Sequence, residues 1–239
     1  MQERPRHLSS NEIDAKAEAV ALHFDAEALT RQVSPLYEVM NGFKNKYHVP
    51  FLFDQDLRVS KRGRKILGRF NFASREISID RVLPYDCPRF RWTLCHEMGH
   101  LVLHRNLERK LISSTKPVFI DTRTQLRFVR TATRSELDWV EWQANKFASA
   151  LLLPRPLVYT VLTEVQRQLE IPRLGSIYLD DQHHNLVAYL TTLPLVSQRL
   201  NVSRTMLRIR FLDLGILVDA RSFHRDPIQD ALRSLFSEA

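Results

Sequence analysis

The fold is decided by one stretch of the chain, Arg89-Phe-Arg-Trp-Thr-Leu-Cys-His96-Glu-Met-Gly-His100-Leu-Val-Leu-His104. Apolar residues recur in it at helical spacing, which predicts a helix over residues 90–104. His96 and His100 then lie one turn apart on the same face, so both imidazoles can bind a single ion. This arrangement suits Zn²⁺, for which each Zn–N bond is about 2.0–2.1 Å long.

Glu97 and Gly99 add two further expectations to this H-E-x-x-H motif. Glu97 follows the first histidine and can contact a metal-bound water without binding the metal itself. A bound metal lowers the pKa of such a water toward about 7, and the carboxylate accepts the proton as the water attacks a carbonyl. A glycine inside a helix costs about 1 kcal/mol relative to alanine. Gly99 therefore predicts that a second backbone packs closely against this helix, and Glu97 is the predicted general base.

A second helix is expected to supply the third ligand that a zinc site needs. Residues 136–153 show helical periodicity, and Glu141, Ala144, Asn145 and Ala148 fall on one stripe. The two alanines allow close packing against the first helix, with Glu141 directed at the ion. Asn145, one turn further on, is expected to hydrogen-bond a metal-binding histidine and orient it.

Three other side chains compete with Glu141 for this role. His104 lies about 12 Å along the helix axis from the first histidine, at about 1.5 Å per residue, so one ion cannot bind both. His104 is expected beside the ligands or at the surface. Glu136 and Asp138 precede Glu141 on the second helix, but neither has small residues following it on its own stripe. Glu141 is therefore the preferred ligand.

These motifs together resemble those of the ImmA/IrrE family of metalloendopeptidases. The second motif is Glu141-x-x-Ala-Asn-x-Phe-Ala-x-x-Leu-Leu-Leu-Pro154, and the match covers residues 45–156 well. The resemblance implies an α+β, zincin-like core, with a small antiparallel or mixed sheet over the H-E-x-x-H helix. It also implies that His96, His100 and Glu141 bind Zn²⁺, with Mn²⁺ as the alternative ion, and that Glu97 is the general base.

The resemblance further implies an activity and a substrate. Well-studied members cleave a helix-turn-helix transcriptional repressor and so switch on genes of a mobile element or a stress response. The expected function is therefore a zinc-dependent endopeptidase whose substrate is a repressor protein. The competing hypothesis is a non-catalytic, metal-binding regulator that binds DNA or a repressor through its C-terminal helices.

The C-terminal part of the sequence has helix-turn-helix character over residues 195–215. Ser203 is a predicted N-cap and Gly215 a predicted helix end. Arg204 and Arg208 on the second helix are candidate contacts to DNA or to a partner. Residues 155–239 carry a net charge of only +1, from ten basic and nine acidic residues. Since DNA affinity depends on neutralising phosphates, packing or substrate docking is the favoured role of this segment.

The chain is expected to divide into three parts. Residues 1–40 form a helical segment that begins with a capping box at Ser9. Residues 41–156 form the metallopeptidase core, which includes a hairpin of strands 65–72 and 76–79. Residues 157–239 form an all-α region, which includes the helix-turn-helix segment and a final helix over residues 227–236.

Composition limits the remaining alternatives. No apolar run approaches the roughly 20 residues that span a bilayer, so we expect no contact with a membrane. The polar start of the chain and its two cysteines favour a cytoplasmic protein with free thiols. The net charge of +8 is concentrated in residues 58–69 and 105–134. These basic stretches suit an acidic or nucleic-acid-bound substrate, or a solvated surface.

Overall fold

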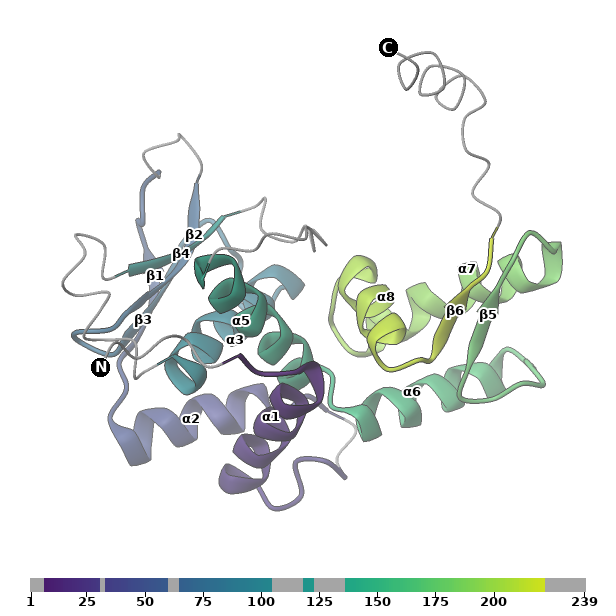
Figure 1. Ribbon diagram of the computed structural model, residues 1–239, viewed down its shortest axis with the longest axis horizontal. Helices are drawn as coiled ribbons and strands as arrows, with labels where there is room; N and C mark the ends of the chain where they lie inside the picture. Colours follow the sequence, from purple (N-terminus) through teal and green to yellow (C-terminus); the bar gives the residue numbers. More distant parts are fainter. Residues whose placement is uncertain (1–6, 31–32, 60–64, 105–117, 123–135, 222–239) are drawn as a thin grey trace, which may run out of the picture.

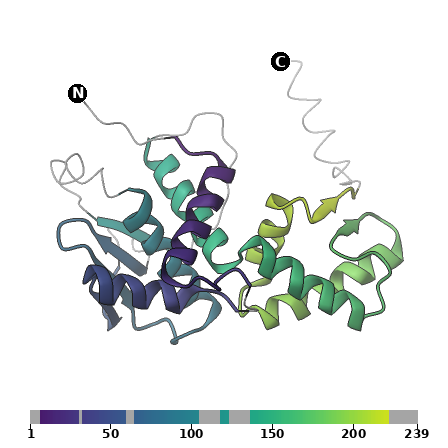
Figure 2. The same cartoon turned by 90° about the horizontal axis from the view of Figure 1, so that it is seen from below.

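A computed structural model of the chain describes residues 7–30, 33–59, 65–104, 118–122 and 136–221. The expected helix over residues 227–236 and most of the basic stretch 105–134 lie outside these residues. The described part has the α+β architecture that the sequence predicts, with helix α3 (Pro88–Leu103) packed against a small sheet. Figures 1 and 2 show a core that contains this sheet and a C-terminal group of helices beside it. No described helix is long and apolar enough to cross a membrane.

The sheet is mixed and has four strands in the order β1-β3-β2-β4. They are β1 (Phe51–Gln55), β2 (Ile66–Asn71), β3 (Glu76–Asp80) and β4 (Val118–Thr122). The predicted hairpin is confirmed, because β2 and β3 pair antiparallel across a turn at residues 72–75. β1 runs parallel to β3, and β4 pairs antiparallel with β2 at the other edge.

Two helices at the N-terminal end cover the core. The predicted capping box is present at α1 (Ser10–Phe24), where the Ser9 hydroxyl accepts from the Glu12 amide and the Glu12 carboxylate accepts from the Ser9 amide. α1 packs against α2 (Leu36–Tyr47) and against α5 (Glu136–Leu152). α2 extends across residue 40, where the first expected part of the chain ends, and the three-part division stays a prediction.

α3 is the central helix of the core. Its first turn is capped by Cys87, whose Sγ accepts from the amide of Phe90. Every residue of α3 from Phe90 to Leu101 is buried, because the sheet contacts it on one side and α5 on another. A helix surrounded in this way can place charged side chains away from water, which is the condition for an internal metal or catalytic centre.

The C-terminal region is mainly helical but not all-α, which corrects the expectation from sequence. It contains α6 (Arg155–Gln168), α7 (His183–Arg199) and α8 (Arg204–Asp213). Two short strands, β5 (Ile177–Leu179) and β6 (Leu217–Asp219), pair in parallel. Strands of three residues are too short to show the alternating pattern that predicts a strand. The α7–turn–α8 arrangement has the expected helix-turn-helix character, with Ser203 capping α8.

Candidate metal centre

His96 and His100 lie on one face of α3, as their spacing predicts. Their Nε2 atoms are 3.0 Å apart and both side chains are buried. Two nitrogen lone pairs repel each other at this separation unless a proton or a cation lies between them. The pair is therefore arranged to bind one positive centre.

Glu141 on α5 completes the cluster. Its Oε2 lies 3.4 Å from His96 Nε2, and its Oε1 lies 3.6 Å from His100 Nε2. Ligand atoms of the three residues all lie within 4.8 Å of one another. Two ligand atoms bound tetrahedrally at about 2.0–2.1 Å are separated by about 3.3 Å, so the spacing of the cluster fits one zinc ion. This donor set of two imidazoles and one carboxylate fits a divalent metal.

The approach of α5 to α3 depends on Gly99, as the sequence predicts. A Cβ atom at Gly99 would lie 3.1 Å from both the Cα and the carbonyl oxygen of Ala144. Contacts this short to backbone atoms leave no room for a larger residue without moving α5. Because Ala144 follows Glu141 by less than one turn, the glycine–alanine contact sets the distance of the carboxylate from the histidines.

Asn145 contacts one of the two histidines on the side away from the cluster. The Nδ1 atom of His96 lies 2.9 Å from the Asn145 Oδ1 atom. An amide oxygen only accepts hydrogen bonds, so Nδ1 is the protonated nitrogen of this ring. The lone pair of the neutral imidazole is therefore on Nε2, the atom that faces Glu141 and His100.

A second hydrogen-bonded chain supports the other histidine, and the sequence did not predict it as a unit. His100 Nδ1 lies 3.1 Å from His104 Nδ1, and His104 Nε2 lies 3.1 Å from the Oε1 atom of Gln143. Since the glutamine oxygen accepts, His104 Nε2 is the donor, and in this tautomer His104 Nδ1 accepts from His100. This order leaves the lone pair of His100 on Nε2, inside the cluster.

Burial keeps both His100 and His104 neutral at physiological pH. Burial is the largest cause lowering the pKa of His104 to about 4, and the hydrogen bond that His104 donates to Gln143 opposes the shift only in part. Burial and the neighbouring His96 and His104 also lower the pKa of His100 well below its usual value. Neutral imidazole is the form that binds metal ions.

Glu97 lies on α3 between the two histidines and faces the sheet. Its side chain is buried. A Cβ atom at Gly68 of β2 would lie only 2.7 Å from Glu97 Oε1 and 2.4 Å from the Cγ2 atom of Thr93. Gly68 therefore lets the sheet approach the carboxylate closely. A glycine within a strand indicates such an approach, and this was the signal that sequence reasoning overlooked.

Cys95 adjoins His96 in the sequence but has no part in the described cluster. Its side chain is buried, and burial raises the pKa of its thiol. Thiol reactivity requires the thiolate form. Cys95 is therefore a packing residue of the core in this structure.

The two arginines predicted as DNA or partner contacts lie on α8, outside the cluster. Arg204 is exposed, whereas the Nη2 atom of Arg208 donates to Asp219 Oδ2 at 2.8 Å. A guanidinium that is held by a carboxylate must give up that ion pair to contact a phosphate. Of the two, Arg204 is the more exposed, and Arg208 is partly exposed.

Comparisons with known proteins extend this description. The model of the peptidase M78 family, the IrrE N-terminal-like domain, matches residues 86–212, which is more than half of the 239 residues. A solved Mycobacterium tuberculosis transcriptional regulator is similar at 14% sequence identity with a TM-score of 0.46. The similarity covers 84% of this chain and 48% of the regulator, so the chain spans about half the regulator's length. A search of the curated proteins gives no match.

Proposed function

The chain belongs to the peptidase M78 family, and from this premise we propose that it is a zinc-dependent endopeptidase. The observation that carries the proposal is the convergence of His96, His100 and Glu141 within 4.8 Å. Catalytic zinc sites use three protein ligands and keep a further position for water or substrate, whereas structural sites use four. We assign these three residues as the ligands, with Zn²⁺ as the ion and Mn²⁺ as the alternative.

The residues behind the ligands support this assignment. Asn145 accepts from His96, and the His104–Gln143 pair accepts from His100, so both rings direct an Nε2 lone pair into the cluster. Hydrogen bonds of this kind fix the tautomer and orientation of metal-binding histidines. Two histidines that only packed in the core, without a metal, would not require both lone pairs to converge.

Glu97 is the proposed general base. A bound zinc ion supplies Lewis acidity, which lowers the pKa of water toward about 7. Glu97 then accepts the proton of the attacking water at a carboxylate oxygen and delivers it to the nitrogen of the leaving amine. The close contact of Gly68 holds this carboxylate in place, and its burial keeps bulk water from competing for the proton.

The proposed substrate is a protein, specifically a helix-turn-helix transcriptional repressor in the cytoplasm. The resemblance of the two motifs to the ImmA/IrrE family supports this choice. Cleavage of the repressor would release the genes that it silences. The α7–turn–α8 segment is proposed to dock the substrate, because residues 155–239 as a whole carry a net charge of only +1 for binding DNA.

The proposal is tested by comparing protein N-termini in cells that express the wild-type chain or the Glu97→Gln variant. Glutamine preserves the size of the side chain but cannot accept the proton, so cleavage should fall by about 100-fold or more while bound zinc is retained. New N-termini that appear only with the wild type identify the substrate. His96→Ala, which removes a ligand, should match Glu97→Gln in activity but contain less zinc.

Two results would contradict the proposal. Equal cleavage by the wild type and by Glu97→Gln would remove Glu97 from the mechanism. If neither produces new N-termini while the zinc-loaded protein binds DNA in a salt-sensitive manner, the chain is instead a non-catalytic regulator.

A further inference from the structure

A cavity of about 490 Å³ lies outside the metal centre, between α1, α2 and the sheet. Its described lining comes from α1 and α2, from β2 and the turn that follows, and from the last turn of α3. Small-molecule sites are typically about 300–1,000 Å³ in volume and mostly apolar. None of the three residues of the metal cluster lines this cavity, so it is a separate site.

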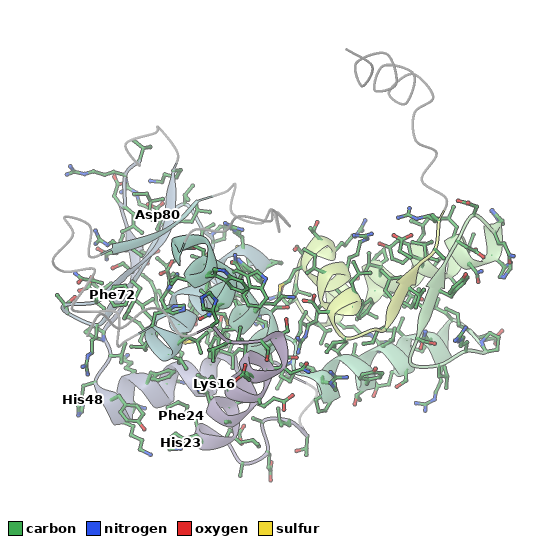
Figure 3. All side chains as sticks on the ribbon, in the orientation of Figure 1. Lys16, His23, Phe24, His48, Phe72 and Asp80 are labelled. Atoms are coloured by element: carbon green, nitrogen blue, oxygen red, sulfur yellow. The ribbon has the colours of Figure 1, made fainter. Side chains whose placement is uncertain are left out.

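Aromatic rings form the walls of the cavity. On the helical side, the rings of Phe24 and Phe43 meet edge to face with centroids 5.0 Å apart. On the sheet side, Phe70 and Phe72 meet in the same way at 4.7 Å. Figure 3 shows Phe24 on α1 and Phe72 beside the sheet. Such walls favour a hydrophobic occupant, since burying apolar surface contributes about 25 cal/mol per Å².

Gly42 on α2 shapes the helical wall. A Cβ atom at this position would lie 2.1 Å from the Cδ1 atom of Phe24, so only glycine lets the ring lie across α2. Glycine in a helix interior is destabilising relative to alanine. Gly42 therefore lowers the stability of α2, and it lies where it allows the Phe24 ring to form a wall of the cavity.

The exposed side of the cavity is positively charged. The cations Lys16 of α1 and Arg75 of the turn after β2 are exposed lining residues, and Lys46 is a further cation nearby, with its Nζ atom 3.0 Å from Nε2 of the lining residue His23. Figure 3 shows Lys16 and His23 along α1 beside Phe24. Among the described residues, no aspartate or glutamate lines the cavity, and neither Lys16 nor Arg75 forms an ion pair. An apolar cavity with a cationic mouth selects an amphipathic anion.

We propose that this cavity binds a hydrophobic monocarboxylate, with its hydrocarbon part between the aromatic walls and its carboxylate at Lys16 and Arg75. A carboxylate suits the two side chains because both donate charge-assisted hydrogen bonds to it. The hydrocarbon part fills space that the protein's own side chains leave open. A neutral alcohol or an amine of the same length also fills the cavity, but it does not form the charge-assisted hydrogen bonds of a carboxylate.

The end of α3 fixes the direction of the bound molecule. Leu101 and Val102 line the cavity in the last turn of this helix. The C-terminal end of a helix carries a partial negative charge, which repels a carboxylate. The hydrocarbon end therefore lies against Leu101 and Val102, next to His100. A ligand in this position stabilises the turn of α3 that carries a residue of the metal cluster.

The proposal is tested by calorimetric titration of the full chain with decanoate, decan-1-ol and decylamine, each below its micelle concentration. Decanoate should bind at one site per chain. Its affinity should exceed that of either neutral or cationic analogue by about tenfold or more, since hydrogen bonds to charged groups contribute about 1.5–3 kcal/mol. This experiment needs no protease substrate, so it succeeds or fails independently of the proposed function.

Two kinds of variant locate the site. Lys16→Gln combined with Arg75→Gln should weaken decanoate binding by about tenfold or more and leave decanol binding unchanged. Lys44→Gln combined with Arg155→Gln removes the same charge from exposed positions outside the described lining and should change neither. Val20→Trp should fill the cavity and abolish binding of both, while circular dichroism confirms that the variant is folded.

Several results would overturn the proposal. Absence of decanoate binding would exclude the site, and equal affinities for decanoate and decanol would exclude recognition of the carboxylate. Binding that is unaffected by the Lys16 and Arg75 changes would place the anion elsewhere on the protein. If Val20→Trp does not fold, the comparison of the two double variants still decides the outcome.

Discussion

Helices α3 and α8 both bury charged or ionisable side chains, but with opposite consequences. On α3, the nitrogens of His96 and His100 converge with the carboxylate of Glu141, so every donor at the centre is a Lewis base. On α8, the guanidinium of Arg210 is 2% exposed and donates to both carboxylate oxygens of Asp14 at 2.9 Å. The first group is a set of Lewis bases that fits a metal cation, whereas the second already contains a cation.

This difference in chemical character distinguishes the His–His–Glu cluster, which can bind a ligand, from the Arg210–Asp14 ion pair, which connects helices. Arg210 also donates from Nε to the carbonyl of Leu153, so one side chain links α8 to α1 and to the end of α5. Its charge is neutralised within the protein. At the metal centre, the Nε2 atoms of two imidazoles face each other and the Glu141 carboxylate, an arrangement that can bind a metal ion. A group of buried ionisable side chains therefore indicates a ligand site where all of them are Lewis bases, and a structural contact where a cation and an anion neutralise each other.

Replacing Arg210 should have a large effect on stability and little effect on metal binding. Arg210→Met leaves the largely buried Asp14 carboxylate without its cation, which should lower the free energy of unfolding by about 3 kcal/mol. Urea denaturation measures this loss. The half-exposed Arg208 on the same helix is the matched control, and Arg208→Met should cost less than about 1 kcal/mol. A Tm of Arg210→Met equal to that of the wild type would show that the ion pair is not needed for docking α8.

The two chains of hydrogen bonds behind the histidines can be compared directly. Gln143→Ala and Asn145→Ala should each weaken zinc affinity by about 10–100-fold, measured by competition with a chromophoric chelator, because each removes the group that orients one ligand. Gln143→Glu keeps an acceptor at the same place and should restore affinity. Unchanged affinity in Gln143→Ala would mean that the His104 chain does not orient His100.

The smallest predicted effect concerns Asp219 at the end of β6. Arg221, and then Arg208, hold the pKa of this carboxyl at about 2, against a usual value near 3.8. A lowered pKa means that the carboxylate stabilises the fold above about pH 4 and that this contribution is lost as the pH falls toward about 2. Asp219→Asn should therefore lower stability by about 1–2 kcal/mol at pH 7 and by much less at pH 2. A constant difference across this range would contradict the role of charge.

The features predicted best from the sequence are those that depend on the helical spacing of residues close together in the chain. The grouping of His96 with His100 follows from a four-residue spacing, and Glu141 follows from a stripe of small residues on the second helix. Gly99 correctly indicated a close backbone approach, which Ala144 provides. In each case the residues on which the prediction rests lie on one helix.

The features that sequence reasoning missed depend on how separate elements meet. The His104–Gln143 hydrogen bond needs the register between α3 and α5, which neither helix specifies alone. β5 and β6 are forty residues apart, counting from Ile177 to Leu217, and each has only three residues. Tertiary packing decides both.

The most direct test of the account is the zinc content of the purified chain, measured by mass spectrometry beside His96→Ala and Glu141→Ala. Glu164→Ala, which removes a carboxylate from α6 far from the cluster in the sequence, is the matched control. The account predicts about one zinc ion per chain in the wild type and in the control, and its loss from both ligand variants. Full zinc occupancy in Glu141→Ala would contradict the assignment of the third ligand, and with it the account of how α3 and α5 build the centre.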